Sequence, residues 1–358
     1  MTIIKKILLL FIILITIFIL YRLYLQRKAL LEEGFREGYD ESSIDSKEEY
    51  DSLINTMVLP PSIGNFNCPP SMAIKDIVIK GSYNTAYMGG NYVSTDMIKY
   101  VMHRGCRFID FEIYNYTNTN GNKSPVVAVS SQPETIDTLN NIPFTEALNA
   151  IDDTAFVVDS GELTVPNPDD PLFIHLRIQN VDDGSFYSDI NEILGSVLGY
   201  KMYGDNITKN TLFSEIAGKY VVLIDKTSRG YLSENGQNII TNKNGETGGV
   251  EFMMYYNATI LSQNTRPPIL ETTSTTNVTN ETIVLADKGT DFWGYHINPN
   301  MKQLIDFYGV QIVACKYYTY DANLEYCEEL FRNFGSGITL LANAVAYVRN
   351  DDNTNEDE

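Results

Sequence analysis

The stretch Gly105-Cys-Arg-Phe-Ile-Asp-Phe-Glu-Ile113 says more about the fold of this chain than any other segment. Its apolar and aromatic residues predict a buried strand over 107–113. Asp110 and Glu112 lie two positions apart, and side chains two apart on a strand leave on the same face. We expect that face to be the inner one. The segment therefore predicts a core strand that also carries a pair of carboxylates.

Strand and helix candidates alternate on both sides of this segment. Strands are expected at 76–80, 107–113, 125–130, 171–178, 219–225, 251–256, 309–315 and 337–341. Helices are expected at 95–103, 144–151, 186–198, 211–217, 300–307 and 322–333, with polar loops at 228–249 and 262–282. Near-eightfold alternation over about 270 residues predicts an α/β fold of the (β/α)8 TIM-barrel type. A doubly wound sheet is the alternative fold.

The N-terminus carries a different signal. Residues 7–21 contain no charged side chain, and the apolar span reaches Leu25 if Arg22 snorkels, which is about the length of one transmembrane helix. A cleaved signal peptide is the rival interpretation, but no small-residue cleavage site follows. Basic residues flank both ends, so they do not decide the orientation in the membrane. We expect an anchor over 1–25, a juxtamembrane helix and linker over 26–70, a barrel over 71–348 and a disordered acidic tail over 349–358.

The charge balance excludes one class of partner. The first 36 residues hold six of the 26 basic and two of the 46 acidic residues, which leaves about −24 on the remainder. Nucleic acid requires a basic face, so we expect no nucleic-acid partner. The four cysteines are far apart in the sequence and form no CxxC pair, which argues against a zinc site.

Functional residues of such barrels gather at the carboxyl ends of the strands. In this chain those ends carry polar side chains, namely Ser82, Asn84 and Thr85, Asp110 and Glu112, Ser130, Arg177, and Lys226. His175 and Arg177 lie two apart on one strand and share a face in the same way as the two carboxylates.

Taken together, these segments resemble the catalytic domains of phosphatidylinositol-specific phospholipases C. Ser82-Tyr-Asn-Thr85 is similar to the family's Ser-His-Asn-Thr segment, and residues 105–112 resemble its Gly-Cys-Arg-x-x-Glu-x-Asp segment. Residues 171–177 resemble its Pro-Val-Ile-Leu-Ser-Leu-Glu strand, and the likeness covers most of residues 71–342. It implies a distorted TIM barrel that cleaves phosphodiester bonds with two histidines, and a calcium site of one Asn and three carboxylates in the calcium-dependent branch.

The chain departs from this family at both histidine positions. The resemblance places Tyr83 at the first and Val129 or Ser130 at the second. Tyrosine, with a pKa of about 10, and serine without a partner base do not supply acid–base chemistry near neutral pH. His175 alone is expected to face inward, where a hydrogen-bonded core role is favoured over a catalytic one.

The positions that the resemblance assigns to calcium have also changed. They are occupied by Asn84, Asp110, Glu112 and Arg177, which sum to −1 without an ion. A guanidinium can bridge two carboxylates and lowers the affinity of the site for calcium. We therefore expect an internal salt-bridge cluster and no metal. Metal-independent bacterial members of the family place an arginine where calcium would lie, so Arg177 could still bind a phosphate.

These observations predict a single-pass membrane protein with a catalytically degenerate phospholipase C-like domain that binds a ligand or acts as a scaffold. Arg177, Asn84 and Lys226 are the candidate contacts to a phosphate-bearing or lipid headgroup ligand, although Lys226 could equally be a solvated loop residue. One alternative is an active phosphodiesterase that uses a rewired acid–base pair such as Tyr83 and His175. Another is a purely structural membrane-tethered domain.

Overall fold

The computed structural model describes a large part of the chain beyond residue 62. The described residues are 63–69, 71–118, 120–130, 135–157, 165–179, 184–205, 207, 210–224, 254–257, 282–285 and 298–355. The expected anchor over residues 7–25 and the candidate ligand residue Lys226 lie outside them. Within the described ranges, no helix has the length and apolar character needed to cross a membrane.

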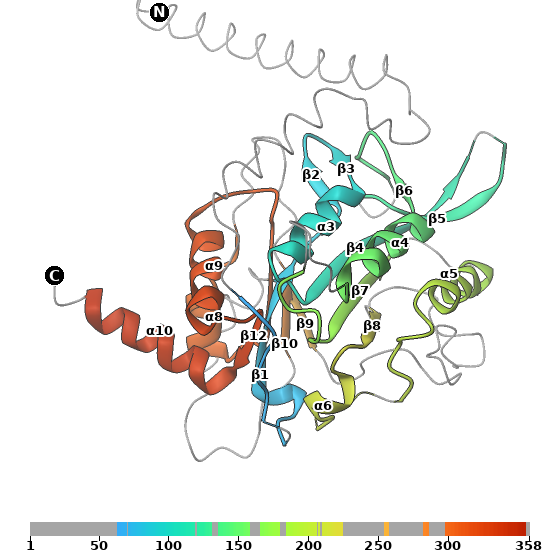
Figure 1. The fold of residues 1–358 in the computed structure, drawn as a ribbon. Coiled ribbons are helices and arrows are strands. Elements are labelled where there is room, and N and C mark those ends of the chain that lie inside the picture. Colours follow the sequence, from blue (N-terminus) through green and yellow to red (C-terminus); the bar gives the residue numbers. More distant parts are fainter. Residues whose placement is uncertain are drawn as a thin grey trace, which may run out of the picture. The chain divides into compact units, whose positions relative to one another are not determined.

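Seven parallel strands form the centre of the fold (Figure 1). They are β1 (Ile77–Ser82), β4 (Phe108–Thr117), β7 (Leu172–Ile178), β8 (Tyr220–Ile224), β9 (Met254–Asn257), β10 (Thr282–Leu285) and β11 (Ile312–Cys315). Along the chain, each of these strands pairs with the next one, and β11 pairs with β1. The exception is β8 and β9, which share no ladder among the described residues. The strand order therefore follows the sequence, and the last of the seven strands lies next to the first.

Three further strands join this sheet in the antiparallel sense. The C-terminal half of β4 pairs with β5 (Lys123–Val127), and β5 pairs with β6 (Ile142–Pro143). On the other side, β12 (Ile338–Leu340) pairs with β1. The segments 125–130 and 337–341 were therefore wrongly expected as parallel barrel strands, because alternation identifies a strand but not its partner or direction. Conversely, β10 begins where a Thr- and Asn-rich loop was expected to end. A separate hairpin joins β2 (Tyr87–Gly89) to β3 (Tyr92–Val93).

All six helices expected from the sequence are present. They are α3 (Thr95–His103), α4 (Phe144–Ala155), α5 (Gly184–Val197), α6 (Phe213–Ile216), α8 (Met301–Tyr308) and α9 (Ala322–Phe334). Figure 1 shows α4 and α5 beside β5, and α9 beside β12. A further helix, α10 (Leu341–Asn355), was not expected and continues past residue 349, where the acidic tail was placed.

The two faces of the sheet form two different cores. The inner core contains Ile77, Ile79, Tyr83, Phe108, Phe173, Val221, Leu223, Ile312, Ala314 and Ile338. The outer core lies between the sheet and the helices and contains alternate residues of the same strands, such as Val78 and Val313. Asp110 and Glu112 lie on the same face of β4 as Phe108, and Arg177 lies on the same face of β7 as Phe173. The expected polar site therefore lies on the inner face.

Residues 63–69, which we call the strap, belong to the folded domain although the sequence placed them in the linker. Asn65 Nδ2 donates to Asp169 Oδ2 over 2.7 Å, and the backbone N–H of Phe66 donates to Asp170 Oδ1 over 2.8 Å. The Phe66 ring packs edge-on against Phe213 with the centroids 5.4 Å apart. Asp169, Asp170 and Phe213 precede β7 and β8, so the strap crosses the amino ends of these strands, opposite the expected site.

Candidate functional site

The parallel ladder between β4 and β7 brings four polar side chains together. Asp110 is paired with His175, and Glu112 with Arg177, in successive same-face positions of that ladder. All four are buried. Two buried carboxylates therefore face a buried guanidinium and an imidazole across one pair of strands. Ionised groups away from water require partners, which the ladder supplies directly.

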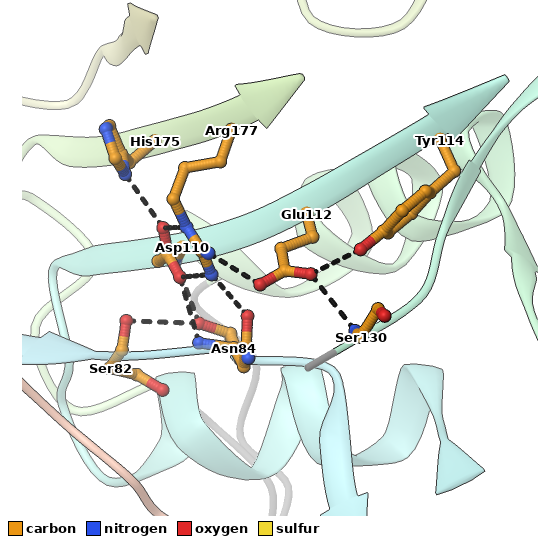
Figure 2. Close-up of polar contacts among 9 residues, drawn as sticks. Ser82, Asn84, Asp110, Glu112, Tyr114, Ser130, His175 and Arg177 are labelled. Atoms are coloured by element: carbon orange, nitrogen blue, oxygen red, sulfur yellow. Dashed lines mark hydrogen bonds and ion pairs between the residues drawn. The ribbon is translucent and has the colours of Figure 1, made fainter. Parts of the chain in front are cut away.

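Arg177 is the centre of the cluster, as Figure 2 shows. Its Nε donates to Asp110 Oδ1 over 2.9 Å and its Nη2 to Asp110 Oδ2 over 2.7 Å, so that this pair is bidentate. Its Nη1 donates to Glu112 Oε1 over 2.6 Å, and Nη2 also donates to Asn84 Oδ1. The structure thus brings together the four residues expected to form a salt-bridge cluster. A guanidinium suits this role because its donors form a planar fork.

The turn after β1 holds the cluster from the other side. Asn84 has a φ of 45°, a left-handed conformation that asparagine tolerates better than most residues. This conformation lets its backbone N–H donate to Asp110 Oδ2 over 3.0 Å. Thr85 exchanges two hydrogen bonds with the Asp110 backbone, each 2.9 Å long. The turn and β4 are therefore locked together at the carboxylate.

Tyr83, the residue at the first expected histidine position, is buried beside the cluster. Its ring centroid lies 4.8 Å from Arg177 Cζ, which is a cation–π contact. Val129 and Ser130, the candidates for the second position, follow β5. Val129 is half-buried, while Ser130 is buried and donates its backbone N–H to Glu112 Oε2 over 3.2 Å. Ser130 thus contacts the cluster through its main chain.

Tyr114 is a member of the site that was not expected from the sequence. Its hydroxyl donates to Glu112 Oε2 over 2.7 Å. The same alternation that places Asp110 and Glu112 on one face of β4 puts Tyr114 there too, so the signal was present. Together, Arg177, Tyr114 and Ser130 supply donors to both oxygens of Glu112.

The electrostatics of the cluster follow from burial and pairing. Burial alone would raise the pKa of Asp110, but Arg177 and the hydrogen bond from His175 outweigh it and hold this pKa well below its usual range. Burial acts against the charge of Arg177, yet the two carboxylates raise its pKa above the usual value. Burial and the neighbouring Glu112 raise the pKa of Tyr114. Arg177 and Asp110 are therefore charged at neutral pH, and the Tyr114 phenol is protonated.

His175 is held in place on two sides. Its Nδ1 lies 2.8 Å from Asp110 Oδ1, and its ring stacks on Phe108 with the centroids 5.6 Å apart. It therefore has the hydrogen-bonded core environment that was expected. His103 is the last residue of α3 and belongs to neither strand of the ladder that carries the cluster.

The donor set does not fit calcium. Calcium takes six to eight oxygen ligands. In this site Asn84 Oδ1, both oxygens of Asp110 and Glu112 Oε1 all accept hydrogen bonds from Arg177. Across the described residues, no group of His, Cys, Asp and Glu side chains is arranged to hold a metal ion. Instead of a metal ion, the two carboxylates hold the Arg177 guanidinium.

Comparison with known families identifies this arrangement. Residues 71–224 match the family described as phosphatidylinositol-specific phospholipase C, X domain. This match supports a place for the segment in the phospholipase C-like phosphodiesterase superfamily. The matched region begins just before β1 and ends with β8, so it contains every described member of the cluster.

Solved structures agree with the superfamily fold. Crystal structures of L. pealei PLC21 and S. officinalis PLC21 each superpose with a TM-score of 0.53 at 13% sequence identity. They cover 79% and 80% of this chain, while the chain covers 39% of each of theirs. At this identity the likeness shows the fold alone. A search of curated protein sequences finds no match to the chain.

Proposed function

We propose that this chain is a single-pass membrane protein whose phospholipase C-like domain binds a phosphate-bearing ligand or acts as a scaffold, and no longer cleaves phosphodiesters. We also propose that this domain is a (β/α)8 barrel. Seven consecutive parallel strands, the last of which returns to the first, support that description.

One observation carries the functional proposal. The Arg177 guanidinium fills the space between Asn84, Asp110 and Glu112, and the Tyr83 ring covers it. By resemblance these are the calcium positions and the first histidine position of the family. By this resemblance, the Arg177 guanidinium occupies the calcium position, and the Tyr83 ring occupies the position of the general base.

The loss of acid–base groups supports the same proposal. Cleavage by an attacking hydroxyl needs a base with a pKa near neutral and an acid for the leaving group. The positions that the resemblance gives to these roles hold Tyr83 and Val129 or Ser130. The Ser130 backbone N–H donates to Glu112, and its hydroxyl lies 3.2 Å from that of Thr135. The residue at the second position is therefore also held by hydrogen bonds within the domain.

A second candidate function rests on the His175–Asp110 contact. A carboxylate that orients an imidazole is a recurring feature of catalytic bases. An active phosphodiesterase would use this pair with Tyr83. The burial of His175 and its stacking on Phe108 favour the binding function over this alternative. A purely structural domain is the third possibility, and it predicts no ligand at all.

The membrane part of the proposal rests on residues 7–25. We expect the intact chain to begin at Met1 or Thr2 and to resist carbonate extraction. N-terminal sequencing and extraction of membranes check both points. A mature N-terminus near residues 25–30 would show that the segment is a cleaved signal.

The test of the binding proposal is headgroup release from vesicles that contain phosphatidylinositol. The full chain would be assayed with calcium and with a chelator, beside the Tyr83→Phe variant and an active phosphatidylinositol-specific phospholipase C as the positive control. We expect no release by the chain under either condition, but more sedimentation with these vesicles than with phosphatidylcholine vesicles, to which the anchor alone would bind. Release that disappears in Tyr83→Phe would favour the rewired enzyme. Neither release nor binding would leave the structural domain.

A further inference from the structure

Five lysine and arginine side chains are buried in the described part of the protein, and they divide between the two faces of the sheet. Lys80, Arg104 and Arg107 belong to the outer layer. Lys80 and Arg104 pair with Glu328 of α9, and Arg107 donates to the carbonyl of Ala155 in α4. Arg177 and Lys316 remain, and Arg177 is the centre of the cluster described above.

Lys316 follows β11, and the alternation of this segment gives its direction. Ile312 and Ala314 belong to the inner core, whereas Val313, Cys315 and Tyr317 belong to the outer core. Lys316 lies between two outward residues and is 1% exposed. Its side chain therefore lies on the inner side of the sheet.

The register places Lys316 beside Tyr83. Ser82 pairs with Cys315 in the parallel ladder, and the Tyr83 N–H continues it by donating to the Cys315 carbonyl over 2.8 Å. Tyr83 and Lys316 are thus the next neighbours on the inner face. Because Tyr83 also covers Arg177, both inner-face cations belong to positions next to Tyr83 at the carboxyl ends of the strands.

Asn298 fixes the loop that carries Lys316. Its Oδ1 accepts the Lys316 N–H over 2.5 Å, and its Nδ2 donates to the carbonyls of Lys316 and Thr319 over 3.3 and 3.0 Å. Asp321, which caps α9, accepts from the Asn298 N–H over 2.7 Å. The backbone of Lys316 is therefore held before any ligand binds, which lowers the ordering cost of binding.

Charge balance shows why a second cation matters. Asp110, Glu112 and Arg177 sum to −1, so this cluster alone repels an anion. We propose that Lys316 is the group that binds the phosphate of the ligand, beside Tyr83 at the carboxyl end of the sheet. This inference rests on the proposed binding function and adds to it the residue and the charged group recognised. The ligand class is a phosphate ester, either free in solution or in a lipid headgroup.

The test compares ligand binding by full chains in detergent micelles or on vesicles. The probes are inorganic phosphate, myo-inositol 1-phosphate, and vesicles with or without phosphatidylinositol in phosphatidylcholine. The variants are Lys316→Gln, Lys316→Arg and, as a control, Lys123→Gln, which removes an exposed lysine on β5. We expect Lys316→Gln to bind at least about tenfold more weakly, Lys316→Arg to keep most of the affinity, and Lys123→Gln to bind like the wild type.

Binding of the soluble esters would indicate a free ligand. Stronger binding to vesicles with phosphatidylinositol than to vesicles without it, and no binding of the esters, would indicate a lipid headgroup. Wild-type affinity in Lys316→Gln would overturn the role of Lys316 and leave the binding function standing. No binding of any probe by the wild type would overturn both. Should Lys316→Gln fail to fold, the Nζ resonance of Lys316 in the ¹⁵N-lysine-labelled wild type, assigned with Lys316→Arg, should shift on ligand addition. An unchanged resonance at a saturating ligand concentration would overturn the proposal.

Discussion

The Tyr83 ring lies over the Arg177 guanidinium, with its centroid 4.8 Å from Cζ, and both side chains are buried. This contact joins the turn after β1 to β7 across the inner face of the sheet. It also closes over a cation that two carboxylates already hold. The stability of this part of the domain and its response to metal ions should therefore depend on Arg177.

Replacing Arg177 by Met should strongly destabilise the protein. The change leaves Asp110 and Glu112 buried without their cation, and removing one partner from a buried pair costs about 3–5 kcal/mol. Urea unfolding measures the loss. The control is Arg349→Met, which removes the pair with Asp306 on an arginine that is 50% exposed, and should cost about 0–1 kcal/mol. Equal losses in the two variants would contradict the central role of the cluster.

Replacing Arg177 by Glu should create a calcium-dependent protein. The variant combines Asn84 with three carboxylates, which are the oxygen donors that calcium prefers, and a bound ion stabilises the folded state by mass action. We expect a calcium-dependent rise in melting temperature in Arg177→Glu and none in the wild type or in Arg177→Gln. If calcium acts equally on all three proteins, the arginine is not what excludes the ion.

Asp170, which binds the strap, should make stability depend on pH. Its burial raises the pKa to about 6 from an ordinary 3.8. Since the folded pKa is raised, this group's contribution to stability is complete below pH 3.8 and is lost as the pH rises through 6. Asp170 should therefore make the wild type roughly 1 kcal/mol more stable at pH 5 than at pH 7.5, relative to Asp170→Asn. Urea unfolding of both proteins at the two pH values measures this difference. If the free energy of unfolding changes by the same amount in the wild type and in Asp170→Asn, the prediction is wrong.

The strap should also be sensitive to a methyl group at Gly105. Gly105 has a φ of 81°, and a Cβ added there would overlap Cδ1 of Ile63. Gly121 has the same φ with no atom within 4 Å of an added Cβ, so Gly121→Ala isolates the backbone strain. We expect Gly121→Ala to cost about 1 kcal/mol, and Gly105→Ala to cost a further 1–3 kcal/mol or so. Gly105→Ala alone should also become sensitive to proteolysis within residues 63–69.

Much of the local structure follows from the sequence. The pattern of apolar residues predicts α3 and the strand that contains Asp110 and Glu112, because each element places its apolar residues with its own period. The same alternation puts the two carboxylates on one face, and the spacing of His175 and Arg177 does so on β7. Together with the segments that resemble the phospholipase C family, these local patterns predict the superfamily that the comparison supports and four members of the site.

The pairing of strands was decided only by the tertiary structure. Residues 125–127 and 338–340 are strands, as expected, but they run antiparallel to their partners, and β10 was not among the expected strands. Partner and direction depend on contacts between segments far apart in the chain, which no local period encodes. For the same reason the strap was taken for linker, since its contacts with Asp169 and Asp170 span about a hundred residues.

For the site, the sequence determined which charges are present, and the tertiary structure decided how they are used. The sequence alone gives one guanidinium and two carboxylates on two of the expected strands. Only the folded geometry shows that Arg177 bonds to Asp110, Glu112 and Asn84 at once, that Tyr83 covers it, and that the register places Lys316 beside Tyr83. The physical reason is that Coulomb and hydrogen-bond energies depend on distance and burial, and both are properties of the packed chain.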